Sequence, residues 1–288
     1  MAQNENKNCQ TIQEFKKSSE CHLEHIFECG QCFRWNKYED GYIGVVGDKV
    51  AYVYEKDDVI CLEGAKEEDR QFWWEYFDFG RDYGWIMRKL EKDEILKEAM
   101  KYGYGIRILK QEPFETLISF IISANNRIPM IKRAVENIAR RFGEKIEFKG
   151  MEFYSFPTAE QLSRATVKDL EECGTGFRAP YIVEAVRKIK EEKIDLEEIK
   201  KLDTDEAMKR LLEFKGVGPK VADCVLLFSM QKFDAFPVDV WVKKIMQKFY
   251  LAPDVSLNKI REFGKNKFGN LSGFAQQYLF YYARENKV

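Results

Sequence analysis

A lysine and an aspartate lie in two short segments whose residue types suit chemistry by an amine nucleophile. Lys220 follows the run Gly216-Val-Gly-Pro, and Asp239 follows Phe-Pro-Val. The proline before Lys220 suits the first position of a helix, so the lysine falls in the first helical turn. The positive end of the helix dipole disfavours a cation there, and an uncharged lysine amine is the nucleophile that Schiff-base formation requires. The two segments predict a covalent step in which Lys220 attacks and Asp239 is its carboxylate partner.

The same segment also predicts a contact with a nucleic-acid backbone. One helix ends, Gly216-Val-Gly218 makes a tight turn and a second helix begins, which is a helix-hairpin-helix. Glycines allow the turn and the close approach of a ligand, and the free N–H groups at the new helix start can hold a phosphate. Phosphate contacts of this kind do not depend on base sequence. We therefore expect Gly216 and Gly218 to contact DNA.

Simpler interpretations of these residues remain open. Lys220 could be a lysine that contacts phosphate or solvent, and Asp239 could serve only as a helix N-cap. The intervening helix of about eleven residues spans roughly 16 Å, and the loop after it is long enough to return that distance. Lys220 and Asp239 can therefore meet at two helix N-termini. The alternative is a DNA-binding module without activity, and borohydride trapping separates the two, because only an amine nucleophile forms a covalent adduct.

The first part of the chain alternates between apolar and polar residues in the manner of β-strands. Asp40-Gly41, Gly47-Asp48 and Asp57-Asp58 separate short apolar runs and indicate hairpin turns. From about Asp69 the apolar residues recur at helical spacing. The predicted strands are Phe27–Trp35, Gly41–Val46, Val50–Tyr54 and Val59–Leu62.

The chain from Ile106 onward has the pattern of an almost entirely helical domain. We predict an α+β fold, with an N-terminal antiparallel β-sheet domain with flanking helices over residues 1–105 and a mostly α-helical catalytic domain over residues 106–288. The predicted helices are one that starts at Pro113, then Met130–Phe142, Thr158–Cys173, Pro180–Glu192, Asp203–Phe214, Pro219–Met230, Asp239–Tyr250 and Ser272–Glu285.

Composition limits the class of protein. The formal net charge is −1, so binding of a nucleic acid requires a local basic patch. The seven cysteines are an odd number and no secretory signal precedes them, which favours a reducing cytosol over a disulfide framework. No apolar run reaches the length that spans a membrane. We expect a cytoplasmic protein, associated with the nucleoid if the source is prokaryotic.

The hairpin with Lys220 and the Pro-Val-Asp239 segment resemble the helix-hairpin-helix glycosylase superfamily, and four motifs from about Cys29 to Phe280 resemble 8-oxoguanine DNA glycosylases in particular. The resemblance implies base excision repair of duplex DNA that contains 8-oxoguanine, by base flipping, glycosylase chemistry and strand cleavage by β-elimination. It implies a monomer that needs no metal or other cofactor. No cysteine follows Cys224, so the iron–sulfur loop of related glycosylases is missing. A glycosylase for another damaged purine is the closer alternative.

Two of these motifs imply the base-binding residues. Gly30-Gln-Cys-Phe-Arg-Trp35 resembles the family's Gly-Gln-Ser-Phe-Arg-Trp strand, whose glycine carbonyl accepts the N7 proton that 8-oxoguanine has and guanine lacks. Gln276 and Phe280 resemble the residues that bond the Watson–Crick edge of the flipped base and stack on it. They are four residues apart and therefore share a helix face. The resemblance also implies that Cys224 forms the opposite wall, and that Trp241 stands near the site in place of a histidine.

Two further motifs imply the residues that contact DNA around the flipped base. Ser-Ala-Asn125-Asn-Arg127 resembles an asparagine-rich loop that fills the gap left by the base. Gly-Thr-Gly-Phe177-Arg178 resembles a loop that places an aromatic wedge and an arginine against the opposite base. Met130 stands where the eukaryotic-type enzyme has an arginine that reads the opposite cytosine. This departure predicts relaxed selectivity for the opposite base.

Each of these residues also has an ordinary structural interpretation when it is taken alone. Gly30 could be a bulge glycine in a strand, Phe280 a core aromatic and Cys224 a small buried hydrophobe. Cys29-Gly-Gln-Cys32 resembles half of a zinc site, but no second pair completes a tetrahedral set. The joint occurrence of the motifs in one order favours the catalytic interpretation of Lys220 and Asp239.

Overall fold

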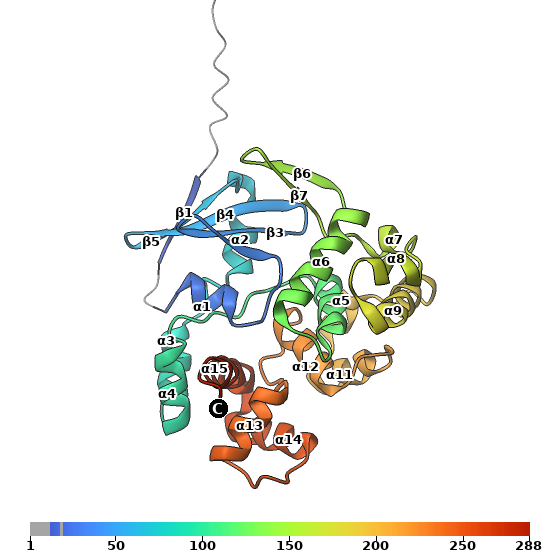
Figure 1. Ribbon diagram of the computed structural model, residues 1–288. Helices are drawn as coiled ribbons and strands as arrows, with labels where there is room; N and C mark the ends of the chain where they lie inside the picture. The colour runs from blue at the N-terminus through green and yellow to red at the C-terminus, as the bar shows by residue number, and fades with distance from the viewer. Residues whose placement is uncertain (1–11, 18–19) are drawn as a thin grey trace, which may run out of the picture.

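The computed structural model describes residues 12–17 and 20–288, and it has a β-sheet near the N-terminus followed by a mostly helical part (Figure 1). The predicted α+β class is confirmed. Cys9 and the rest of residues 1–11, which precede the first strand, lie outside the described residues. Among the described residues, no helix is both long and apolar enough to cross a membrane.

A five-stranded antiparallel sheet in the order β1-β5-β4-β3-β2 forms the N-terminal part. Tight turns join β2 to β3, β3 to β4 and β4 to β5, as the Asp-Gly, Gly-Asp and Asp-Asp pairs predict. One face buries a cluster of aromatic side chains that includes Trp35 and Trp73. The strands are β1 Ile12–Lys16, β2 Trp35–Tyr38, β3 Gly41–Val46, β4 Lys49–Lys56 and β5 Val59–Glu63.

The strand predicted for Phe27–Trp35 is wrong. The segment starts in helix α1, Leu23–Glu28, continues as a buried loop and enters β2 only at Trp35. Leu23, Ile26 and Phe27 are buried on one face of α1, at the spacing of a helix. Gly30 has φ +76°, in the left-handed region that interrupts a strand. A run in which nearly every side chain is buried does not distinguish a strand from a buried loop.

Helices from both parts of the chain pack around the central helix α15 (Figure 1). Helix α4 contacts α15 although it precedes the predicted boundary at residue 105, which stays a prediction. The helices are α2 Arg70–Tyr76, α3 Tyr83–Leu90, α4 Glu94–Tyr102, α5 Pro113–Ser123, α6 Ile128–Phe142, α7 Ala159–Leu162, α8 Val167–Glu172, α9 Ala179–Glu191, α10 Leu196–Lys201, α11 Thr204–Leu212, α12 Pro219–Phe228, α13 Val240–Phe249, α14 Leu257–Phe268 and α15 Ser272–Glu285.

The structure corrects the helical prediction in three places. Thr158–Cys173 forms two short helices, because Thr166 caps a second helix start within the predicted span. A hairpin of β6, Lys145–Phe148, and β7, Met151–Tyr154, lies in the part expected to be almost all helix. Helices α10 and α14 were not predicted, whereas the other predicted helices begin and end within two residues of the observed ones.

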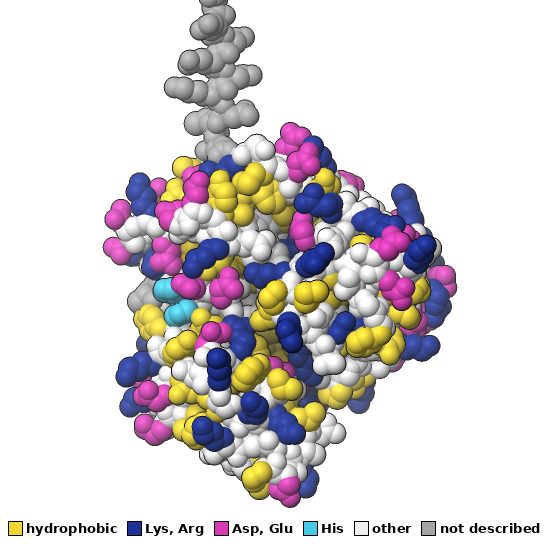
Figure 2. All heavy atoms as spheres, viewed as in Figure 1, with side chains coloured by type: hydrophobic (Ala, Val, Ile, Leu, Met, Phe, Trp, Pro, Cys, Tyr) yellow, Lys and Arg dark blue, Asp and Glu magenta, His cyan; other side chains and the backbone are white. Residues whose placement is uncertain are grey.

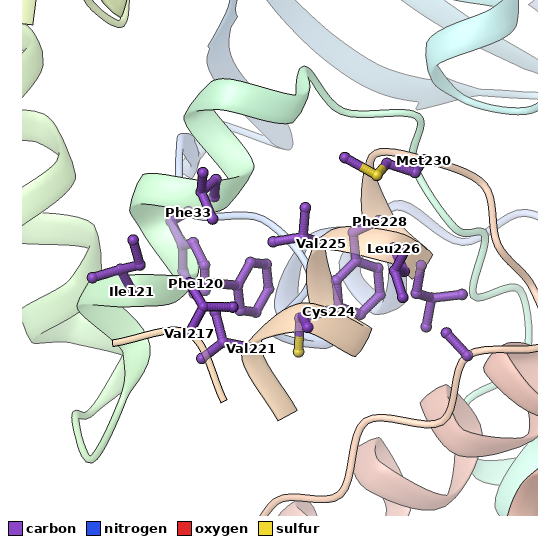
Figure 3. Close-up of a cluster of buried hydrophobic side chains, with 14 of the residues drawn as sticks. Phe33, Phe120, Ile121, Val217, Val221, Cys224, Val225, Leu226, Phe228 and Met230 are labelled. Atoms are coloured by element: carbon purple, nitrogen blue, oxygen red, sulfur yellow. The ribbon is translucent and has the colours of Figure 1, made fainter. Parts of the chain in front are cut away.

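Helices α5 and α12 position the lysine segment through a shared apolar core (Figure 3). The ring of Phe120 from α5 stacks on Phe228 from α12 with centroids 5.5 Å apart. It meets Phe33 from the loop after α1 edge-on at 5.4 Å. Because all three rings are buried, the N-terminal loop and the two helices are held as one unit.

Candidate active site

A cavity of about 600 Å³ opens where α5, α12, α13 and α15 converge. Figure 2 shows the corresponding face, hollowed near its centre, with Lys and Arg side chains along the border of the hollow. All the predicted catalytic and base-binding residues, together with two of the predicted DNA contacts, line this one cavity and come from five separate segments of the chain. They are Gly30, Asn125, Arg127, Lys220, Cys224, Asp239, Trp241, Gln276 and Phe280.

A second hollow, of about 660 Å³, lies beside α7 and α10. Its charged lining is mainly acidic and includes Glu112, Glu115, Glu144 and Asp195. Burial raises the pKa of Glu115 to about 7, and Glu112 adds to that rise whereas Arg34 opposes it. An acidic lining repels phosphate groups, so this hollow does not suit a nucleic-acid backbone.

Lys220 lies in the first turn of α12, with Gly218 as N-cap and Pro219 at the first helical position, as predicted. Its Nζ atom donates a hydrogen bond to Ser123 Oγ at 3.1 Å. The same atom lies 5.1 Å from the centre of the Phe120 ring. The side chain is half-buried and faces the cavity. Ser123 Oγ and the face of Phe120 therefore contact the amine, and the Cys224 thiol also interacts with Lys220.

Asp239 is the N-cap of α13, which confirms the predicted cap. Its Oδ1 accepts hydrogen bonds from the backbone N–H groups of Trp241 at 3.0 Å and Val242 at 2.8 Å. Burial raises the pKa of Asp239, against the opposing effects of these N–H groups and of the Lys220 charge. Among the described residues, Asp239 and Lys220 form no direct ion pair, although both line the cavity and the charge of Lys220 lowers the pKa of Asp239.

The far side of the cavity combines a flat aromatic ring with hydrogen-bonding groups. Gln276 is 4% exposed, and its Oε1 has no hydrogen-bond partner within the described chain. Phe280 follows one turn later on α15 and lines the same cavity. A β-carbon at Gly30 would lie 3.1 Å from Phe280 Cε1, so only glycine fits comfortably there. Burial raises the pKa of the Cys224 thiol to about 12, so this wall of the cavity is neutral.

The two hairpin glycines differ in what surrounds them. Gly216 has φ +80°, and a β-carbon there would lie 2.7 Å from the Tyr181 ring. Gly218 is extended, and a β-carbon there would meet no heavy atom within 4 Å. The predicted close approach at Gly216 is therefore to the protein's own ring. The open space is at Gly218, where a phosphate can approach the start of α12.

The residues predicted to contact DNA around the base do not all lie in the cavity. Met130 and Phe177 are outside it, 46% and 61% exposed, and Phe177 projects from the turn before α9. Arg178 is buried, and its guanidinium donates to the backbone carbonyls of Ala124 at 2.8 Å and Asn125 at 2.9 Å. Arg178 therefore holds the loop that carries Asn125, and contact with a base requires these bonds to be exchanged.

Two family models together match residues 14–269 of the chain. The first describes the N-terminal domain of 8-oxoguanine DNA glycosylases and matches residues 14–117, and the second describes HhH-GPD superfamily base excision DNA repair proteins and matches residues 118–269. The chain belongs to the HhH-GPD superfamily of base excision DNA repair proteins. The family predicted from the four motifs is confirmed.

Individual members of the superfamily match along most of their length. The 8-oxoguanine glycosylase/lyase of Clostridium acetobutylicum, in its complex with duplex DNA containing cytosine opposite 8-oxoguanine, is 52% identical with a TM-score of 0.93, over 96% of this chain and 99% of that chain. A probable N-glycosylase/DNA lyase of Methanothermobacter thermautotrophicus is 37% identical over 68% of this chain and 69% of that protein. The N-glycosylase/DNA lyase of Saccharomyces cerevisiae is 34% identical over 84% and 70%.

Several basic side chains that follow the asparagine loop in the sequence are ion-paired, among them Arg140, Arg141 and Lys145. Arg141 pairs with Glu172 at 2.7 Å and also with Asp169. Lys145 pairs with Glu147 at 2.9 Å and Glu152 at 2.6 Å. These paired side chains are therefore a solvated face, and Arg127, which lines the cavity and has no ion pair among the described residues, is the better candidate for a phosphate contact.

Sequence reasoning missed three residues that shape the cavity of this superfamily member. Ser123 is the hydrogen-bond partner of Lys220, and Gln277 Nε2 donates to the Cys29 carbonyl at 2.7 Å. Arg284 lines the cavity beside Phe280. The spacing of four residues from Gln276 through Phe280 to Arg284 was a signal for the last of these. No local pattern indicated the other two, because both contacts join segments far apart in the sequence.

Proposed function

We propose that this protein excises 8-oxoguanine from duplex DNA and then cleaves the strand, as a bifunctional glycosylase and β-lyase of base excision repair. The observation that carries the proposal is the single cavity that combines Lys220 and Asp239 with the base-binding set of Gly30, Gln276 and Phe280. The relatives named as glycosylase/lyases support it. Because one chain supplies every group of the cavity, we propose that it acts as a monomer, on the DNA of the cytoplasm or nucleoid.

The proposed reaction begins when the flipped nucleotide enters the cavity. The neutral Lys220 amine forms a bond to C1′ of the sugar while the C1′–N9 bond breaks, and the electron pair leaves with the base. Asp239 stabilises the positive charge that develops at the sugar and at the amine. Loss of a proton from nitrogen and opening of the sugar give a Schiff base. Removal of a C2′ proton then expels the 3′ phosphate and nicks the strand.

Recognition of the lesion rests on the groups around Phe280. The flipped base stacks on Phe280, with Cys224 on its other face and the Gln276 amide at its Watson–Crick edge. The Gly30 carbonyl accepts the N7 proton of 8-oxoguanine. Guanine would place a lone pair against that buried acceptor, and an unpaired buried polar group costs about 1–3 kcal/mol. The DNA-contacting roles of Asn125, Arg127, Met130, Phe177 and Arg178 are part of the same proposal.

The direct test is to incubate the protein with a duplex that contains one 8-oxoguanine opposite cytosine and to add borohydride. We expect a covalent protein–DNA band together with release of 8-oxoguanine. Duplexes with an alkylated purine in place of 8-oxoguanine should give neither product. Release of the base without a covalent band would indicate that water is the nucleophile. If neither the band nor the free base appears, 8-oxoguanine is not the substrate of this protein.

We predict that alanine at one hairpin glycine lowers stability, whereas alanine at the other lowers DNA binding. Gly216→Ala should lower the free energy of unfolding by roughly 2 kcal/mol, because it combines a left-handed conformation with overlap against Tyr181. Gly218→Ala should leave stability within about 0.5 kcal/mol. It should weaken DNA binding about tenfold, the loss of one phosphate contact. Urea denaturation and anisotropy titration measure the two quantities, and equal stability losses would contradict the prediction.

We predict an acidic limb in the pH dependence of base excision that belongs to Asp239. Burial raises the folded-state pKa of this acid above its usual value of 3.8. The carboxylate is the active form, so the single-turnover rate should fall as pH decreases through that raised pKa, at a higher pH than for a solvated aspartate. The residual activity of Asp239→Asn should lack this limb. If the limb persists in that variant, another group is responsible.

We predict that the protein discriminates weakly among the four opposite bases. Met130 is exposed on the first turn of α6 and cannot supply the charged hydrogen bonds that an arginine gives to a base. Single-turnover rates opposite the four bases should therefore lie within about tenfold of one another, less than one specific base contact provides. Met130→Arg should widen the range in favour of cytosine. A strong cytosine preference of the unaltered protein would contradict the prediction.

A further inference from the structure

The loop that carries Gly30 is held by side chains at three of four successive backbone carbonyls. Arg284 Nη2 donates to the carbonyl of Glu28, Gln277 to that of Cys29 at 2.7 Å and Gln111 to that of Gln31 at 2.7 Å. Within the described chain, no hydrogen bond reaches the carbonyl of Gly30. The loop is thus fixed on both sides of one free acceptor.

Arg284 brings a free donor to the same place. Its Nη1 is buried and has no hydrogen-bond partner among the described residues. That atom lies 3.2 Å from the position of a β-carbon on Gly30, and Arg284 lines the cavity. The guanidinium lies 5.3 Å from the centre of the Phe280 ring, and Nε pairs with Glu285 at 2.7 Å. A buried guanidinium N–H without a hydrogen-bond partner lowers stability, unless a ligand accepts a hydrogen bond from it.

The order of residues along α15 indicates which atom of the base this donor faces. Gln276, Phe280 and Arg284 follow at intervals of four residues, so they lie along one helix face over about 12 Å. If the base stacks on Phe280 with its Watson–Crick edge at Gln276, its opposite end points toward Arg284. In 8-oxoguanine that end carries the C8 carbonyl, next to the N7–H that faces Gly30. The cavity then offers an acceptor and a donor side by side to N7–H and O8.

We propose that Arg284 is a specificity-determining residue that donates a hydrogen bond from Nη1 to the O8 atom of 8-oxoguanine. This inference rests on the proposed function, because it assumes that this lesion enters the cavity. Guanine has neither the N7 proton nor O8, so the paired contacts would distinguish the two bases at two atoms. The charge of the donor makes the bond stronger than a neutral one.

Equilibrium binding to uncleavable duplexes tests the contact without involving the rate of the chemical step. One duplex carries 2′-fluoro-8-oxoguanosine, a second carries the 8-thio analogue, which keeps N7–H but has a weaker acceptor at C8, and a third carries a tetrahydrofuran abasic site. Arg284→Met should weaken binding to the 8-oxo duplex by roughly ten- to a hundredfold. It should change binding to the 8-thio duplex much less and to the abasic duplex not at all.

A matched variant separates the direct contact from support of the loop. Gln111 donates to the Gln31 carbonyl but does not line the cavity. Gln111→Met should therefore weaken the loop without removing a contact to the base, and it should lower binding to the 8-oxo and 8-thio duplexes equally. Arg284→Lys keeps the charge, but its single donor centre cannot serve both Glu28 and the base, and it should also lose the 8-oxo preference. It serves as the second variant if Arg284→Met does not melt cooperatively.

Two results would overturn the inference: unchanged 8-oxo binding in both Arg284 variants, or equal losses on the 8-oxo and 8-thio duplexes. Failure of the proposed function is distinguishable, because the unaltered protein would then release no 8-oxoguanine. If it releases the base normally while the 8-oxo to 8-thio ratio is the same in the Arg284 variants, only the role of Arg284 is rejected.

Discussion

Lys220→Gln is expected to abolish both base release and borohydride trapping while duplexes that contain the lesion still bind. Removal of a nucleophile typically lowers the rate of the chemical step by a thousandfold or more. Glutamine is one bond shorter than lysine but ends in a polar, uncharged group, and Ser123 Oγ, the present partner of Lys220, remains nearby. The ring of Phe120, whose centre lies 5.1 Å from Lys220 Nζ, can also pack against the flat glutamine amide. Single-turnover excision and a gel for the covalent adduct measure the loss.

The control for this prediction is Lys215→Gln, five residues earlier in the same hairpin. Lys215 is exposed and does not line the cavity. The Lys215→Gln variant should bind DNA slightly more weakly, because one surface charge is lost, and it should still form the covalent protein–DNA band with borohydride. If Lys220→Gln excises 8-oxoguanine at the normal rate, or if Lys215→Gln abolishes trapping, then Lys220 is not the nucleophile.

The chemistry-bearing segments could be predicted because their signals are local. A proline at the first helical position, a glycine N-cap and an aspartate N-cap all act within one turn of helix, so they are visible in a few residues of sequence. Helix α15 was predicted with the observed ends. The positions of Lys220 and Asp239 at two helix starts followed from these signals. Their meeting in one cavity required only that α12 and the loop after it have the right length.

What the sequence did not predict depends on contacts between distant segments. The loop after α1 resembles a strand because its side chains are buried, and they are buried because Gln31 bonds Arg107 and Leu109 across the domain. The aromatic neighbour of Gly216 comes from α9. The DNA contact of Arg178 stays a prediction, and no sequence pattern indicates that its guanidinium also bonds the carbonyls of the asparagine loop. Such partners have no sequence periodicity, so no local pattern identifies them.

Arg261→Met is expected to lower the free energy of unfolding by about 3–5 kcal/mol. Asp223 lies in α12 one turn after Lys220, and its side chain is completely buried. Arg261 of α14 donates to both of its carboxylate oxygens, at 2.6 Å and 2.9 Å. Removal of the arginine leaves a buried carboxylate without its hydrogen-bond donors. Urea denaturation at neutral pH measures the loss.

This deficit is expected to depend on pH in a direction that identifies its cause. Burial raises the pKa of Asp223 and Arg261 opposes that rise, so the pKa should move further upward in Arg261→Met. The folded variant then binds a proton that the unfolded chain releases at lower pH, and its stability decreases as pH rises toward that raised pKa. The deficit should be smaller at pH 5 than at pH 8. An equal deficit at both values would mean that lost packing, not an unpaired carboxylate, is responsible.

Replacement of both partners distinguishes an unpaired charge from a requirement for the ion pair itself. Asp223→Leu combined with Arg261→Met should recover most of the lost stability, because two apolar groups of similar size leave no buried polar atom unsatisfied. Arg187→Met, at an exposed pair with Glu191, is the surface control and should change the unfolding midpoint little. Since α12 begins at the hairpin and carries Lys220, the double variant should also trap DNA with borohydride at nearly the normal rate. A stable double variant that does not trap would show that the Asp223–Arg261 pair positions the nucleophile as well as stabilising the fold.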